Sequence, residues 1–313
     1  EPVISTYNAF GSRLLKEHAL RLGLEPDARV VVDATRYQLA MRVVCQSQYD
    51  LGGLGYSPTT AVTELLKLDE QCSNYLVDPN LIIESDIQRL VGLESIEKKQ
   101  ELTHEMIKTC KKRIELAKLV MDFRQAKIAN DVIDYADQIR LAAQAAQNSQ
   151  AMRDILKDQF HVVLLDEYQD TSQSQVRMLA ALFGGEHPVT AVGDPCQSIY
   201  TWRGASAGTI GAFNKNFPKA AGSKGKDVYE LLTTYRNDKA ILELANVVSE
   251  QIRSESGADV PPLTPRIGAG AGNLICGVFE TIEAEAQARR RSSRAKAQTR
   301  RRRSECKGCS RAY

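Results

Sequence analysis

Long apolar runs are missing from this sequence of 313 residues. No stretch of 18 apolar residues occurs, so the sequence offers no candidate for a transmembrane helix, and we expect no membrane association. The first four residues, Glu-Pro-Val-Ile, have neither an initiator Met nor the basic and then apolar pattern of a secretory signal. This start suggests that the chain begins inside a longer protein. The length is sufficient for two modest domains, each with its own core.

The cysteines do not form a disulfide framework. Seven of them are scattered through a chain that is too large to need stapling, so we expect reduced thiols in the cytoplasm. Only Cys306 and Cys309 have the spacing of metal ligands. Because no second pair and no nearby His accompany them, we assign no metal there.

A broadly basic surface is also absent from most of the chain. The formal net charge is +2, but residues 285–313 contain nine Arg and two Lys against two Glu, an excess of +9, so the remaining 284 residues have a net charge of −7. Any contact with nucleic acid therefore has to come from a local groove. The Arg-rich tail is compatible with nucleic-acid binding and equally with a shifted reading frame, and it cannot form a core.

Two short segments contain most of the residues that suggest chemistry. Residues 164–171 read Leu-Leu-Asp-Glu-Tyr-Gln-Asp-Thr, and residues 192–205 read Val-Gly-Asp-Pro-Cys-Gln-Ser-Ile-Tyr-Thr-Trp-Arg-Gly-Ala. The apolar run 162–165 predicts a buried parallel strand. Two acidic side chains at its end can hold hydrated Mg²⁺ and orient a water molecule. The alternative is that these acidic residues merely end the strand and solvate the loop.

These two segments resemble the UvrD/Rep/PcrA family of superfamily 1 helicases. In that family an Asp-Glu-x-Gln-Asp-Thr block precedes a Gly-Asp-x-x-Gln-Ser-Ile-Tyr-x-aromatic-Arg-Gly-Ala block, and both are present here. The resemblance implies an ATP-dependent DNA helicase that uses ATP and Mg²⁺ to move 3′ to 5′ along single-stranded DNA. It also implies single-stranded DNA and DNA junctions as partners, with a role in repair or recombination. Residues 194–197 and 206–208 resemble actinobacterial members in particular.

The resemblance assigns roles to residues of the nucleotide site. It implies that Asp166 holds Mg²⁺ and that Glu167 activates the attacking water. Gln197 resembles the glutamine that senses the γ-phosphate, although a glutamine in a surface loop is the alternative. Residues 232–237, Leu-Thr-Thr-Tyr-Arg-Asn, resemble a later block in which Tyr235 stacks on adenine and Arg236 reaches the γ-phosphate from the second domain. The family's usual Asn before Tyr-Arg is a Thr here.

The resemblance also indicates a path for DNA. Residues 3–10 are similar to a Thr-Phe-His-(Ser/Ala)-Phe block, with Asn in place of His, and residues 133–137 are similar to an Asp-Phe-x-Asp-Leu block. Aromatic residues two positions apart in an extended segment face the same side and can stack on successive bases. Core packing is the alternative for such a pair. The expected DNA-binding residues are Thr6, Tyr7, Asn8, Tyr200, Trp202 and Arg203.

The pattern predicts an α/β fold with an inserted helical part. Strands are expected at 162–165 and 189–192, with helices at 174–183 and 206–217, an alternation that implies a parallel sheet. With the resemblance, we expect a RecA-like motor domain at 1–35 and 128–222 that lacks its N-terminal phosphate-loop part, and an inserted helical subdomain at 36–127. A second RecA-like domain begins at 227–283, and a basic, disordered tail occupies 284–313. Further elements are expected as helices at 14–22, 102–120, 126–146 and 241–252 and as strands at 30–32, 229–232 and 274–279.

The phosphate-binding motif Gly-x-x-x-x-Gly-Lys-(Ser/Thr) does not occur in the sequence. The single Gly-Lys pair, at 225–226, is followed by Asp and lies in a linker of small residues. We therefore expect these 313 residues alone to lack ATP hydrolysis. Three readings stay open: a fragment of a helicase, a truncated strand-binding or regulatory module, and a nonfunctional product of a disrupted gene.

Overall fold

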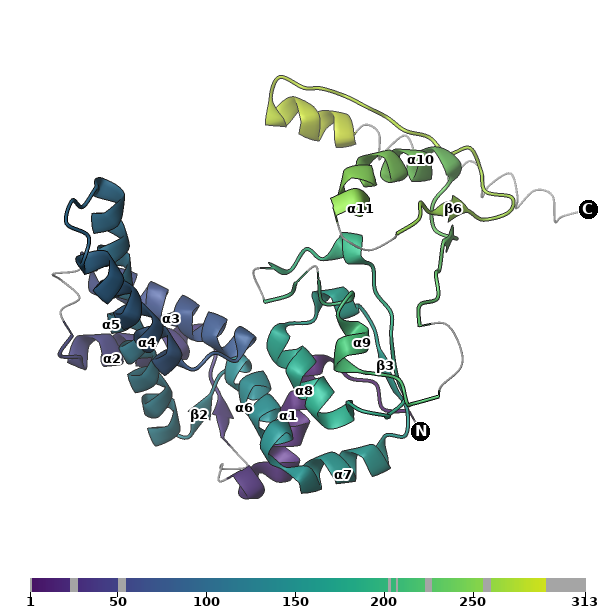
Figure 1. Cartoon of the computed structure of the whole chain (residues 1–313). Coiled ribbons are helices and arrows are strands. Elements are labelled where there is room, and N and C mark those ends of the chain that lie inside the picture. The colour runs from purple at the N-terminus through teal and green to yellow at the C-terminus, as the bar shows by residue number, and fades with distance from the viewer. Residues whose placement is uncertain are drawn as a thin grey trace, which may run out of the picture. The chain divides into compact units, whose positions relative to one another are not determined.

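The computed structural model describes residues 2–22, 28–49, 55–201, 204–206, 208–222, 227–255 and 260–290. The chain divides into two compact units, one formed by residues 1–229 and 251–260 and the other by residues 230–250 and 261–313 (Figure 1). Among the residues described, no helix is both long enough and apolar enough to span a membrane. Trp202 and Arg203 lie outside the described residues.

Three helices build one core of the first unit, and α4 (Pro79–Glu94) packs against one of them, α5 (Glu101–Ala129). Local signals fix their ends: Ser57 and Asp78 cap the second and third helices, each with Pro at the first turn, and Leu76 ends the second in a left-handed conformation. Apolar faces of three of these helices meet around the fully buried Leu65 and Phe123. The four helices are α2 (Asp33–Gln46), α3 (Pro58–Tyr75), α4 (Pro79–Glu94) and α5 (Glu101–Ala129).

The other core of the first unit packs helices against a short parallel sheet. β3 (Val163–Leu165) pairs in parallel with β4 (Val189–Ala191), and the helix between them packs on one face of the pair. Parallel pairing through a helical crossover is the α/β pattern that the sequence predicts. The helices of this core are α1 (Tyr7–His18), continued by the 3₁₀ turn η1 (Ala19–Leu22), α6 (Tyr135–Asn148), α7 (Gln150–Gln159), α8 (Gln173–Phe183) and the short α9 (Phe213–Asn216).

The prediction of a fully buried strand at 162–165 was wrong. Leu165 is 6% exposed and packs in the core, but Leu164 is 76% exposed and Val162 is 61% exposed. Successive side chains of a strand face opposite sides, and no described element covers the side that Leu164 faces. An uninterrupted apolar run therefore does not by itself establish burial on both faces.

Two predicted helices were also wrong in extent. The helix expected at 126–146 is interrupted, because Asp131 has a φ of 50° and β2 (Val132–Ile133) pairs in parallel with β1 (Arg29–Val30) before α6 begins. A capping box between Asp134 and Asp137 starts α6 anew. The helix expected at 206–217 is reduced to α9, preceded by turns at 208–212 among the described residues.

The second unit contains one parallel strand pair and helices. β5 (Thr233–Thr234) pairs with β6 (Thr264–Pro265), and α10 (Lys239–Val248) follows β5; α11 (Glu250–Glu255) spans the boundary of the units. The strands expected at 229–232 and 274–279 are absent, and both segments are irregular and largely exposed. The first seven residues of the expected disordered tail, 284–290, are helical, in a segment rich in the helix formers Glu, Ala and Gln.

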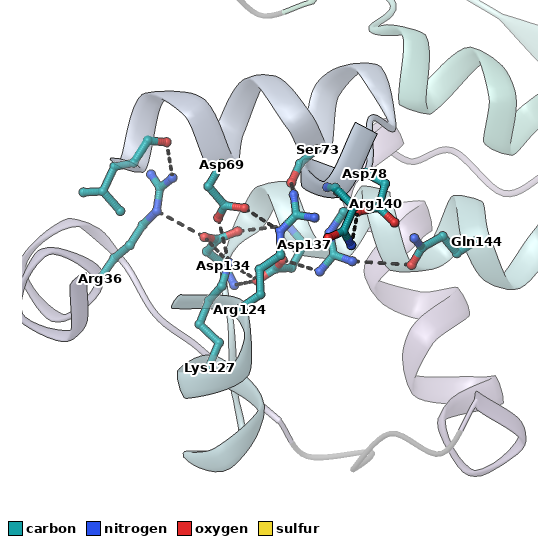
Figure 2. Close-up of polar contacts among 12 residues, drawn as sticks. Arg36, Asp69, Ser73, Asp78, Arg124, Lys127, Asp134, Asp137, Arg140 and Gln144 are labelled. Carbon is teal, nitrogen blue, oxygen red and sulfur yellow. Dashed lines mark hydrogen bonds and ion pairs between the residues drawn. The ribbon is translucent and has the colours of Figure 1, made fainter. Parts of the chain in front are cut away.

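A buried ion network joins the two cores of the first unit (Figure 2). Lys127 of α5 is 2% exposed, and its Nζ lies 3.0 Å from Asp69 Oδ2, 3.1 Å from Asp134 Oδ2 and 2.7 Å from Asp137 Oδ2. Around this centre each carboxylate also contacts one guanidinium group. These outer pairs are Asp69 with Arg124, Asp134 with Arg36, and Asp137 with Arg140.

The electrostatics of this network explain why the buried charges persist. Burial lowers the pKa of Lys127, but the three carboxylates outweigh burial, so that its pKa is raised overall. Burial raises the pKa of Asp137, and the opposing effects of Lys127 and Arg140 lower it to about 2. Buried charges are stable only when they are paired and hydrogen-bonded. The network thus fixes α3 and α5 against the start of α6.

Candidate nucleotide site and nucleic-acid interface

Asp166 and Glu167 follow directly after β3, at the carboxyl end of the parallel pair, where α/β sheets bind ligands. Both side chains are exposed. The Glu167 backbone N–H donates to Asp166 Oδ1 over 3.0 Å, and Glu167 adopts a left-handed backbone with a φ of 50°. The next side chain, Tyr168, is fully buried and packs edge-on against Phe213. This anchor keeps the two carboxylates at the surface.

Gln169 connects these acidic residues to the loop after β4. It is 1% exposed, its Nε2 donates to Glu167 Oε2 over 2.7 Å, and its Oε1 accepts from the Asp194 backbone N–H over 3.1 Å. Its backbone carbonyl accepts from the Ser198 hydroxyl over 3.2 Å. Because the sheet brings the ends of β3 and β4 together, the loops that follow these two strands meet through one side chain.

Gln197 lies in the loop after β4, at the end of the 3₁₀ turn η3 (Pro195–Gln197). Asp194 caps this turn, with Oδ1 accepting from the Cys196 backbone N–H over 2.9 Å and Oδ2 accepting from Gln197 Nε2 over 2.7 Å. Gln197 is exposed, so its amide oxygen is accessible to solvent or ligand. The structure thus brings Asp166, Glu167 and Gln197 to the same end of the parallel pair.

The N-terminal block lies against the same region. Thr6 caps α1, since its Oγ1 accepts from the Ala9 backbone N–H over 3.2 Å. The Tyr7 hydroxyl donates to the Asp166 carbonyl over 3.2 Å and accepts from Thr171 Oγ1 over 3.5 Å. Asn8 is exposed. Of the expected DNA-binding residues in this block, Tyr7 is the one whose side chain directly contacts the backbone of the acidic segment.

The segment expected to contact DNA leaves η3 and returns to the start of α8. Tyr200 is partly exposed, and beyond it the backbone of Ala205 bridges to Ser172 in antiparallel fashion. Gly204 has a φ of 82°, and an added Cβ would lie 2.9 Å from the Asn74 Cβ of α3. This position therefore suits glycine, and it anchors the far end of the loop. Trp202, between these points, is not among the described residues.

Tyr235 and Arg236 belong to the second unit and follow β5 directly. Tyr235 is 76% exposed, and its carbonyl accepts from Arg266 NH1 over 3.1 Å. The Arg236 side chain is also exposed. Both side chains are accessible within their own unit.

The local electrostatics are acidic around residues 166–170. Burial, and then the negative charge of Glu167, raise the pKa of Asp170. The pKa of Tyr7 is raised chiefly by burial, with the hydrogen bond to Thr171 acting in the opposite direction and Asp166 adding to the rise. A neutral tyrosine is therefore the form that donates to the Asp166 carbonyl at physiological pH.

The donor set at Asp166 suits Mg²⁺ in one respect. Mg²⁺ keeps several waters and binds proteins through one or two carboxylates together with substrate phosphates, and Asp166 offers an exposed carboxylate with only one oxygen engaged by a backbone N–H. Among the described residues, no group of three or more His, Cys, Asp or Glu side chains could hold a metal by itself. The site fits a metal that arrives with a nucleotide.

Three features of the site were not assigned a specific role from the sequence. The amide of Gln169 joins two motifs, because it contacts both Glu167 and the Asp194 backbone. An added Cβ on Gly193 would lie 2.4 Å from Gln169 Oε1, so this glycine permits the contact. The Tyr7 hydroxyl adds hydrogen bonds that the family's Phe cannot make. The sequence identifies these residues but does not predict their contacts, because the contacts depend on how closely the loops after β3 and β4 approach each other.

The fold, in which short parallel strands alternate with helices and β3 ends in an acidic pair, is compatible with an α/β motor domain. The model of the UvrD/REP helicase N-terminal domain matches residues 1–218. The chain therefore belongs to the UvrD/REP helicase family. This result confirms the resemblance seen in the sequence.

Individual relatives match parts of the chain. The chain is 34% identical over 120 residues to the ATP-dependent DNA helicase Rep of Escherichia coli, covering 38% of this chain and 17% of that protein. It is 31% identical over 137 residues to the ATP-dependent DNA helicase UvrD2 of Mycobacterium tuberculosis, covering 43% and 19%. A probable DNA helicase II homolog of Mycoplasma capricolum is 25% identical over 246 residues, covering 78% and 30%. The chain thus spans less than a third of each of these relatives.

Proposed function

We propose that this chain is part of an ATP-dependent DNA helicase or translocase, in which ATP hydrolysis drives movement along single-stranded DNA. The observation that supports this most strongly is the hydrogen-bonded junction of the acidic pair with the Gln197 loop and the Tyr7 block. Residues that the resemblance assigns to the nucleotide site and to the DNA path contact one another directly there. The relatives named as ATP-dependent DNA helicases support the same assignment.

In this mechanism the exposed carboxylate of Asp166 would hold Mg²⁺, which would supply charge neutralisation to the phosphates of ATP. Glu167 orients the attacking water and accepts its proton, a task suited to a carboxylate directed by a fixed hydrogen bond from Gln169. Gln197 donates its amide to the γ-phosphate when its contact with Asp194 is exchanged. Tyr235 and Arg236 serve the adenine and the γ-phosphate from the second unit.

The same proposal interprets the architecture. Residues 1–35 and 128–222 form the first RecA-like motor domain, 36–127 form an inserted helical subdomain, and 227–283 begin a second RecA-like domain. Thr6, Tyr7, Asn8, Tyr200, Trp202 and Arg203 line the strand path, with single-stranded DNA and DNA junctions as substrates in repair or recombination. The site of action is the cytoplasm.

A strand-binding module without catalysis is the second candidate function. It is favoured by the sequence, which has no Gly-x-x-x-x-Gly-Lys-(Ser/Thr) segment among its 313 residues. On this reading the Tyr7 and Tyr200 region binds DNA, and the acidic pair has no nucleotide to act on. Parallel assays of ATP hydrolysis and of DNA binding separate the two candidates.

The test uses an extended form of the protein that includes a phosphate-binding loop. We expect Glu167→Gln to retain nucleotide binding while ATP hydrolysis falls by roughly 10²-fold or more, as for the loss of a catalytic base. Glu186→Gln, an acidic residue in the loop before β4, is the matched control and should leave both unchanged. Unchanged turnover in Glu167→Gln, or a loss of binding in place of hydrolysis, would refute the assigned role.

A further inference from the structure

A continuous chain of hydrogen bonds runs between the two residues proposed for hydrolysis and phosphate sensing. It passes from Glu167 Oε2 to Gln169 Nε2 (2.7 Å), from Gln169 Oε1 to the Asp194 backbone N–H (3.1 Å), and from Asp194 Oδ2 to Gln197 Nε2 (2.7 Å). Each step is within ordinary hydrogen-bond distance. Two residues with no assigned role, Gln169 and Asp194, therefore stand between Glu167 and Gln197.

The direction of the Gln169 amide follows from its partners. A backbone N–H can only donate, so the atom facing Asp194 has to be the amide oxygen. The amide nitrogen then faces Glu167, whose carboxylate can only accept when ionised. Because the side chain is 1% exposed, water does not replace either partner readily. A flipped amide would place its oxygen against the Glu167 carboxylate and its NH₂ group against the Asp194 N–H. Both contacts are repulsive, so the flipped orientation is disfavoured.

The backbone around the amide is shaped for this contact. Gly193 precedes Asp194, and a Cβ added there would lie 2.4 Å from Gln169 Oε1 and 3.3 Å from the Gln169 backbone nitrogen. An alanine would displace the end of the glutamine side chain. Ser198 holds the glutamine's own backbone carbonyl from the far side of the same loop. The loop that contains Gln197 is thus attached to Gln169 at two points.

We propose that Gln169 is a positioning residue that couples the Gln197 loop to the carboxylate of Glu167. This inference rests on the proposed function, in which Glu167 is the base and Gln197 contacts the γ-phosphate. When Gln197 exchanges Asp194 for phosphate, Asp194 and its backbone N–H shift, and the Gln169 amide transmits that shift to Glu167. Hydrolysis then depends on the state of the Gln197 loop, which leads toward Tyr200, one of the residues proposed to contact DNA.

The first experiment is independent of activity and uses the 313-residue chain. Amide exchange at Asp194, followed by NMR, should be faster in Gln169→Met than in the unaltered chain, because the methionine thioether is a much weaker acceptor for the Asp194 N–H than the amide oxygen is. Gln138→Met is the matched control: Gln138 is also buried, at 4% exposure, but its amide contacts Ser12 at 3.5 Å. Unchanged exchange at Asp194 in Gln169→Met would overturn the coupling.

The second experiment measures steady-state ATP hydrolysis in the extended form. We expect Gln169→Met to lower kcat by about tenfold or more with nucleotide affinity changed less than about twofold, since a base that is misaligned loses part of its effect without loss of phosphate contacts. Gly193→Ala should give the same split, because it displaces the Gln169 amide without removing it. Gly92→Ala is its control, as an added Cβ there meets nothing within 4 Å.

The outcomes separate this inference from the proposed function. Hydrolysis that survives in Glu167→Gln contradicts the proposed function itself. Hydrolysis lost in Glu167→Gln but fully retained in both Gln169→Met and Gly193→Ala overturns the coupling alone. Melting temperatures show whether each variant is folded. If Gln169→Met is unfolded, the rate of ATP hydrolysis in Gly193→Ala tests the coupling in its place.

Discussion

Lys127→Met tests the ion network that joins the helical core to the sheet-containing core. The substitution removes the one cation that contacts all three buried carboxylates, at 2.7 to 3.1 Å. Removal of one partner from a buried ion pair typically costs 3–5 kcal/mol. Here each of the three carboxylates keeps one guanidinium partner, whereas Asp69 Oδ2 and Asp137 Oδ2 lose the cation that contacts them. We therefore expect a loss of about 3 kcal/mol in the free energy of unfolding.

Urea unfolding followed by circular dichroism measures this loss. Lys118→Met on the same helix is the control, because the Lys118 side chain is 38% exposed and pairs with Glu115 at the surface. Such pairs contribute about 0–1 kcal/mol, so the control should change little. A Lys127→Met protein as stable as the Lys118→Met protein would refute the reasoning, because the buried carboxylates would then not need their central cation.

Three further predictions concern acid, a loop glycine and the tryptophan. The pKa of Asp137 is about 2 in the folded protein, below its unfolded value of about 4. Its contribution of about 2 kcal/mol to the free energy of unfolding is therefore present above pH 4 and is lost as the pH falls toward 2. In Asp137→Asn, urea unfolding should show a smaller loss of stability between pH 4 and pH 2. Gly204→Ala should lower stability by about 1–2 kcal/mol because of its φ of 82°, and equal melting temperatures would contradict this. Single-stranded DNA should quench the fluorescence of Trp202 in the extended form, and Trp202→Ala should weaken DNA binding by roughly 1–3 kcal/mol with little loss of stability; normal binding together with unfolding would place the ring in a core.

Local signals in the sequence were sufficient for many elements of the fold. The alternation of strand and helix between 162 and 192 gave β3, α8 and β4 to within one residue at most ends, since apolar runs and the Ser172 capping box act locally. The interruption at 130–134 was missed because Asp131 takes a left-handed conformation that residue type alone does not demand. The strands expected at 229–232 and 274–279 do not form; in the first segment the pairing begins only at its end, where the Leu232 carbonyl accepts from the Thr264 backbone N–H, and a strand needs a partner along its length.

The candidate site was predictable as a set of residues but not as a set of contacts. Asp166, Glu167 and Gln197 follow from the motifs, and the parallel pairing of β3 with β4 brings them to one end of the sheet. The role of Gln169 depends on the close approach of Gly193, which is a long-range feature of loop packing. The Lys127 network likewise depends on contacts among four helices, α2, α3, α5 and α6, that no local pattern encodes.

ATP hydrolysis measured with and without single-stranded DNA, in the extended form that includes a phosphate-binding loop, tests the central claim most directly. If nucleotide and DNA residues are coupled as proposed, single-stranded DNA raises the rate of hydrolysis at saturating ATP, and the 313-residue chain assayed beside it shows no turnover. A rate of hydrolysis that does not respond to single-stranded DNA, although the DNA binds, would contradict the account.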